Sequence, residues 1–124
     1  MANPNIVSVN SIFGNTTGIA LTTTLTTVLL ANTSASGKVF KIESIMIANV
    51  DGSSAADVTI DWNTDASGTG TSIALAATIA VPADATLSLI DKTNSFYLME
   101  NQSIIGGASA NSDLECIIAY EEIS

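Results

Sequence analysis

The sequence has no histidine and no arginine, and only one cysteine and three lysines among its 124 residues. Most catalysis near neutral pH uses histidine, an activated thiol, or arginine as an anion-binding group. A Ser-His-Asp or Cys-His arrangement is therefore impossible within this chain. No glycine-rich phosphate loop precedes a helical pattern either. We expect a protein that is not an enzyme, has no catalytic residues and needs no cofactor.

Positive charge is also scarce. Lys38, Lys41 and Lys92 stand against 12 acidic residues, which gives a net charge of −9. Three lysines cannot form the basic stripe that a nucleic-acid backbone requires. An acidic chain is also poorly suited to an anionic membrane surface, and five threonines interrupt the apolar run from Ile19 to Ala31. We therefore expect neither nucleic acid nor membrane as a partner.

The single cysteine, Cys116, excludes a disulfide within the chain. It lies in an apolar strand pattern, and no histidine is present to activate it. We expect a buried, inert thiol.

The first 37 residues carry no charged side chain. Such a stretch is unusual for a fully solvated surface, so we expect part of it to lie against another subunit. We assign residues 1–13 to an N-terminal arm and residues 14–124 to one domain; a frayed terminus is the alternative for the arm. The candidate interaction residues of the arm are Asn5, Ile6, Val7, Val9, Ile12 and Phe13.

The hydrophobic pattern has a period of two residues. Val58, Ile60 and Trp62 alternate with polar residues, and similar alternation occurs in 73–81, 86–90 and 114–121. We expect further strands at 39–50 and 22–31, and we expect Gly106-Gly107 to divide the last two strands. The alanines of 74–80 leave a helix open there. The pattern predicts an all-β antiparallel sandwich, jelly-roll-like, with about eight strands.

Two groups of acidic residues are candidates for chemistry. Asp61, Asn63 and Asp65 alternate as in a calcium loop, but its sixth and twelfth positions hold Ala66 and Ser72. These three are weak metal candidates, and a solvated loop at a strand end is the alternative. Paired carboxylates could serve glycoside cleavage, but the sequence shows no aromatic lining for a sugar, and we expect Trp62 in the core.

Several turn motifs between Leu29 and Ile123 follow a known pattern. A long strand ends in Ile47-Ala48-Asn49, Val81-Pro82-Ala83-Asp84-Ala85 forms a turn, and Phe96-Tyr97-Leu98 and the stretch 117–123 follow. The chain thereby resembles small β-sandwich virion proteins of tailed bacteriophages, most of all those of phages infecting marine bacteria and cyanobacteria. The usual Pro-Ala-Gly turn is replaced here by Ala35-Ser36-Gly37.

The resemblance implies an acidic capsid decoration, or cement, protein on the outer surface of the phage head, made in the host cytoplasm. Its partners would be the major capsid protein and copies of itself, in a homotrimer matched to the threefold symmetry of the shell. Two alternatives remain open. One is a structural protein of the tail, neck or fibre, and the other is a carbohydrate-binding module.

Overall fold

The structure is a computed structural model that describes residues 4–124, and over that range it contains nine strands and no helix. This confirms the all-β prediction. No helix able to cross a bilayer is therefore found among these residues. The strands are β1 (Ile12–Ala20), β2 (Val28–Asn32), β3 (Val39–Asn49), β4 (Ala56–Asn63), β5 (Ser72–Val81), β6 (Thr86–Ile90), β7 (Phe96–Leu98), β8 (Gln102–Ala108) and β9 (Leu114–Ile123).

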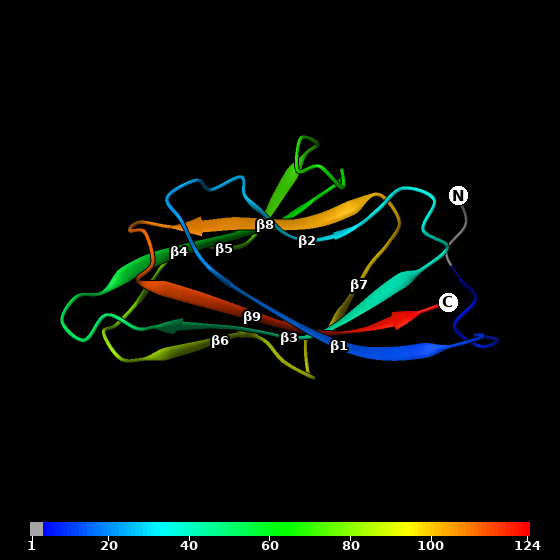
Figure 1. Cartoon of the computed structure of the whole chain (residues 1–124), viewed down its shortest axis with the longest axis horizontal. Coiled ribbons are helices and arrows are strands. Elements are labelled where there is room, and N and C mark those ends of the chain that lie inside the picture. The colour runs from blue at the N-terminus through cyan, green and yellow to red at the C-terminus, as the bar shows by residue number, and fades with distance from the viewer. Residues whose placement is uncertain (1–3) are drawn as a thin grey trace.

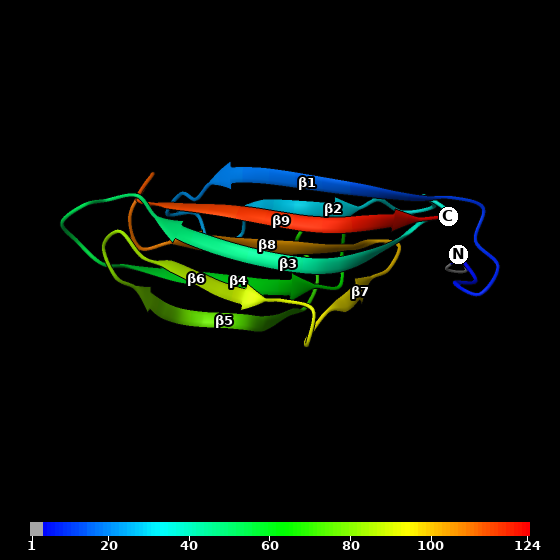
Figure 2. The same cartoon turned by 90° about the horizontal axis from the view of Figure 1, so that it is seen from below.

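The strands form two antiparallel sheets that face each other (Figures 1 and 2). The first sheet has the order β1-β9-β3-β6, with the short β7 also paired to β3, and the second has the order β2-β8-β4-β5. The pairs are nested along the chain: β1 with β9, β2 with β8, β3 with β6, and β4 with β5. This nesting is the arrangement of a jelly roll.

Alternating side chains of both sheets form one core between the layers. In β3 the inward residues Ile42 and Ile45 are three positions apart, which a regular strand would not allow. A register shift against β9 between Ile42 and Ser44 absorbs the extra residue, so Ile45 and Ile47 face inward as well. All three isoleucines are fully buried.

Gly106 and Gly107 lie within β8, so the prediction that they separate two strands is wrong. A Cβ atom on Gly106 would lie 2.4 Å from the Thr59 carbonyl oxygen, and one on Gly107 would lie 2.7 Å from that of Thr22. The glycines are thus required because other backbone segments approach β8 closely. The Gly106 N–H donates to the Thr27 oxygen at 3.0 Å.

Three other local predictions differ from the structure. The strand expected at 22–31 begins only at Val28, and residues 22–27 form a loop over β8. The helical alternative for 74–80 is wrong, because this stretch lies in β5, where Ala76 pairs with Ile60. Strand β1 was not predicted as a strand of the sandwich.

Three buried asparagines end successive strands and hold the loops that follow. Asn32, Asn49 and Asn63 are the last residues of β2, β3 and β4, and none is more than 3% exposed. The Asn49 amide donates to the carbonyl oxygens of Ser54 (3.0 Å) and Val81 (2.8 Å). Each asparagine therefore satisfies backbone groups that a turn would otherwise leave buried without partners.

Candidate interaction surface

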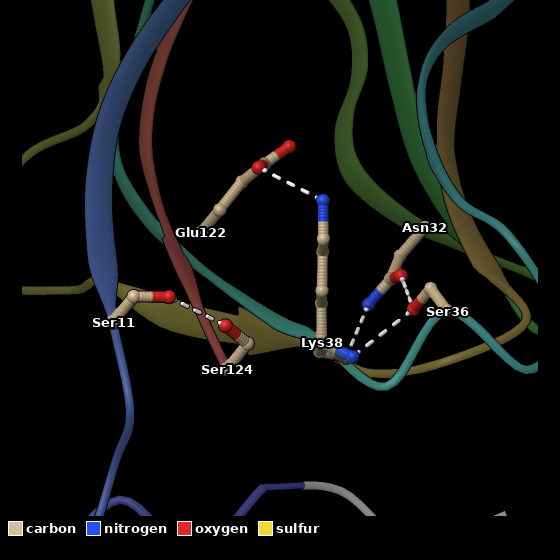
Figure 3. A network of polar contacts seen from close by, with 6 residues as sticks. All are labelled: Ser11, Asn32, Ser36, Lys38, Glu122 and Ser124. Atoms are coloured by element: carbon tan, nitrogen blue, oxygen red, sulfur yellow. Dashed lines mark hydrogen bonds and ion pairs between the residues drawn. The ribbon is translucent and has the colours of Figure 1, made fainter.

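The extended N-terminal arm is not confirmed. Ile12 and Phe13, which we assigned to it, are the first residues of β1. Before them, residues 5–8 form a tight turn in which the Ser8 N–H donates to the Asn5 oxygen at 3.0 Å. Ser11 then pairs with Ser124 through both backbone groups, and their hydroxyls lie 2.7 Å apart (Figure 3).

The predicted interaction residues of this region are nevertheless exposed, except for the half-buried Val9. Val7 is 91% exposed, Phe13 62% and Ile6 53%. Asn5 holds the turn, because its Oδ1 accepts the Val7 N–H at 3.0 Å. Within residues 4–124 these apolar side chains stay largely open, and their predicted contact role stays a prediction.

Strand β1 forms a long open edge of the first sheet, which we call the β1 edge (Ile12–Ala20). Figure 2 shows it at the margin of the layer. Its nine residues, IFGNTTGIA, include no charge and no proline. Its register with β9 runs without a shift from Ile12 opposite Ile123 to Ala20 opposite Glu115. A long, regular, uncharged edge is a template for pairing with another strand.

The other edges among the described residues lack this combination. The second sheet ends at β5, which is bent by two register shifts against β4 and holds Thr78 at a φ of 55°. Its other edge, β2, has five residues and a register shift near Val28. In the first sheet, the strands opposite β1 are β6, with five residues, and β7, with three. Short and bulged edges resist pairing with another strand. Among the edges of the described residues, only β1 lacks this protection against pairing.

A second surface lies on the opposite side of the sandwich, and we call it the apolar band. It consists of Ile6, Trp62, Ile73, Phe96, Tyr97 and Met99. Two shallow hollows, of about 250 and 330 Å³, share Tyr97 and Met99 as lining residues. Ile73 is 57% exposed and Tyr97 43%. The band is therefore a continuous apolar surface that the chain itself leaves partly open.

Trp62 packs against the core, as expected, but it also lines the larger hollow. There it lies near Phe96 and Tyr97, and its indole N–H donates to Gln102 Oε1 at 3.3 Å. Sequence reasoning found no aromatic lining, because Trp62 and the Phe96-Tyr97 pair are separated along the chain and meet only when β7 pairs with β3. No sequence signal would have joined them.

Two of the three predicted calcium residues, Asn63 and Asp65, are engaged in hydrogen bonds within their own loop. Asn63 is fully buried, and its Oδ1 accepts the N–H groups of Asp65 (2.9 Å) and Gly70 (3.0 Å). Hydrogen bonds from the Ser67 hydroxyl and N–H occupy Asp65 Oδ1 and lower the pKa of this carboxyl. Asp61 lies on β4, outside this network, and residues 4–124 contain no group of three His, Cys, Asp or Glu side chains that could hold a metal ion. The side-chain oxygens of Asn63 and Asp65 thus bind groups of their own loop.

Cys116 and the Glu43–Glu121 pair are further titratable groups with shifted pKa values. Cys116 is fully buried, which confirms the predicted burial, and burial raises the pKa of its thiol to about 12, which disfavours the reactive thiolate. On the outer face of the first sheet, a hydrogen bond between Glu43 and Glu121 lowers the pKa of Glu43 and raises that of Glu121. Lys41 Nζ lies 3.4 Å from Glu43, which makes this an ordinary surface ion cluster.

Lys38 is bound within the chain as well. Its Nζ lies 3.2 Å from Glu122, and its backbone carbonyl accepts the Asn32 amide at 2.9 Å (Figure 3).

No family model matches the chain, and no curated protein matches it. The description of possible function therefore rests on the surfaces themselves.

Proposed function

We propose that the protein is a structural component of a tailed-phage virion that decorates the outer surface of the head. It would bind the major capsid protein and stabilise the shell through contacts between subunits. The apolar band is the observation that carries this proposal. Exposed apolar patches of this kind mark sites of protein association, and the band contains no charged residue.

The absence of usable chemistry supports a contact function. The chain has no histidine or arginine, its thiol is buried, and the loop carboxylate of Asp65 is occupied by hydrogen bonds. Jelly rolls serve in viral capsids and in lectins, so the fold is compatible with the proposal but does not select it.

Repetition on a regular shell would make weak contacts sufficient. Each copy needs only modest affinity when many neighbouring sites hold it at once. The expected homotrimer remains part of this proposal as the form that fits a local threefold axis.

The test begins with purified virions that contain the chain, separated into heads and tails and analysed by mass spectrometry. The proposal requires the chain in the head fraction. A location in tails would favour the tail, neck or fibre alternative and overturn the decoration role.

Binding to expanded heads then tests the apolar band. Ile73→Asp places a charge in the proposed contact and should weaken binding at least tenfold. Val50→Asp is the matched control, because Val50 is 53% exposed and lies outside the band. Equal binding by both variants would exclude the band as the contact surface.

One observation favours a carbohydrate-binding module as the second candidate. Trp62, Phe96 and Tyr97 together line one hollow, and sugars stack on such rings. Saturable quenching of Trp62 fluorescence by glycans, lost in Tyr97→Ala, would favour this function. No quenching by any glycan would remove it.

A further inference from the structure

The β1 edge is nearly self-complementary. When the strand is read in both directions from Thr16, residues of like character stand at equal distances. The equivalent positions are Asn15 and Thr17, Gly14 and Gly18, Phe13 and Ile19, and Ile12 and Ala20. A twofold contact between identical strands requires this kind of symmetry, because each residue meets its counterpart across the axis.

The free backbone groups of β1 have the same symmetry. Ser11 exchanges both backbone hydrogen bonds with Ser124, and the Leu21 N–H donates to the Leu114 oxygen. Because the groups of an antiparallel strand alternate between its two sides, the odd-numbered residues of β1 face β9. The N–H and C=O groups of residues 12, 14, 16, 18 and 20 therefore point outward. These five positions are symmetric about Thr16.

The side chains of the strand also permit the pairing. Gly14 has no atom within 4 Å of an added Cβ, and the nearest atom to one on Gly18 is 3.8 Å away. Neither glycine has positive φ, so no contact or turn inside the chain requires them. Glycine within a strand often marks the close approach of another backbone, and here each glycine would face the other one.

Charge does not oppose this contact, although the chain carries a net charge of −9. The side-chain carboxylates nearest to the β1 edge are on β9, where Glu122 is opposite Phe13 and paired with Lys38, Glu121 is opposite Gly14 and Glu115 is opposite Ala20. Across a twofold seam, two β1 strands would separate the carboxylates of one copy from those of the other. That spacing is about 14 Å, which exceeds the screening length at physiological salt.

From these observations we propose that two copies of the chain pair antiparallel through their β1 edges, with Thr16 opposite Thr16 of the second copy. The two first sheets then form one continuous sheet, held by about ten backbone hydrogen bonds. Phe13, which is 62% exposed, lies against Ile19 of the second copy. The inference uses the β1 edge and not the apolar band, so it stands apart from the proposed contact with the capsid, but it replaces the homotrimer of that proposal with a dimer as the form of the free chain.

The first test is the mass of the full chain in solution, measured by sedimentation equilibrium. The expected value is twice the chain mass of 12.7 kDa. Thr16→Pro removes an outward N–H without touching the ladder to β9, so it should give a folded monomer. A monomer or a trimer for the unchanged chain would overturn the inference. A trimer would leave the proposed function standing.

Cross-linking tests the register. In the proposed pair the two Thr16 Cα atoms are about 5.5 Å apart, within reach of a disulfide. Mild oxidation of Thr16→Cys should therefore give at least tenfold more covalent dimer than oxidation of Ile12→Cys. Ile12→Cys is the matched control on the same strand, because its two copies would be roughly 27 Å apart.

A mixture of Ile12→Cys with Ala20→Cys should also cross-link, because these positions face each other across the seam. The native Cys116 is fully buried and common to all variants. Equal yields from Thr16→Cys and Ile12→Cys would overturn the register, and circular dichroism of each variant ensures that folded protein is compared.

Discussion

Strands β8 and β1 each contain two glycines, but only those of β8 are surrounded by the chain. A Cβ on Gly106 would lie 2.4 Å from the Thr59 oxygen, whereas one on Gly14 would meet nothing within 4 Å. The glycines of β8 are explained by the backbone segments that approach this strand closely. The glycines of β1 have no such reason within the chain. Gly106 and Gly107 are therefore required by the folded chain itself, whereas Gly14 and Gly18 lie on an edge strand that is open to a partner.

Gly106→Ala should show the largest effect on stability. The added methyl group would overlap the Thr59 carbonyl and force the β4–β8 pairing apart. We expect a loss of about 3 kcal/mol or more in the free energy of unfolding, measured by urea denaturation. A loss below about 1 kcal/mol would contradict the close approach.

Asn49→Ala should be nearly as destabilising. It leaves the buried Val81 oxygen and the Asp51 N–H without their partners, at a cost of about 2–4 kcal/mol. Asn15→Ala is the control, because Asn15 is exposed on β1, and should stay within about 0.5 kcal/mol. If both variants lose the same stability, the asparagine does not hold its loop.

Gly14→Ala is the direct counterpart of Gly106→Ala on β1. Since the new methyl group meets no atom and the unfolded chain loses freedom, the stability of the single subunit should stay the same or rise by up to about 1 kcal/mol. The measurement is urea denaturation in the monomeric Thr16→Pro background. A loss as large as that of Gly106→Ala would erase the contrast between the strands.

The smallest effect concerns pH. Hydrogen bonds from Ser53, Ser67 and Thr93 lower the pKa values of Asp51, Asp65 and Asp91. Folded pKa values below the unfolded value of about 3.9 mean that this stabilisation is complete above pH 5 and lost as the pH falls through 4 and below.

The urea midpoint should therefore fall between pH 5 and 3, and Ser67→Ala should reduce that fall by removing a donor from Asp65. Because the Ser67 N–H remains in this variant, the reduction is partial. A midpoint that is constant across this range would contradict the role of these loops.

The parts of the fold predicted from sequence are those with local signals. The alternation in β4 and β9 directly reports one buried and one exposed face, so these strands were predicted. Strand β1 was missed because both of its faces are largely exposed, which removes the alternation. The roles of Gly106 and Gly107 depend on Thr59 and Thr22, which are distant in sequence, so the glycines read as a turn.

The candidate surfaces were likewise predictable only where the signal is local in the sequence. The uncharged N-terminal region directed attention to Ile12 and Phe13, whose contact role stays a prediction, and their place in an edge strand appears only when β9 pairs with them. The apolar band joins residues of β4, β5 and β7 with Ile6, and no spacing along the chain predicts their meeting. The virion role remains a prediction from resemblance and surface character.

Amide hydrogen exchange along β1, followed residue by residue by NMR at two protein concentrations, tests the central claim most directly. Odd-numbered amides such as those of Phe13 and Thr17 should be protected at both concentrations by their bonds to β9. The amides of Gly14, Thr16 and Gly18 should become protected as the concentration rises and two copies pair. Exchange of these three at the rate of free amides at every concentration would contradict the account.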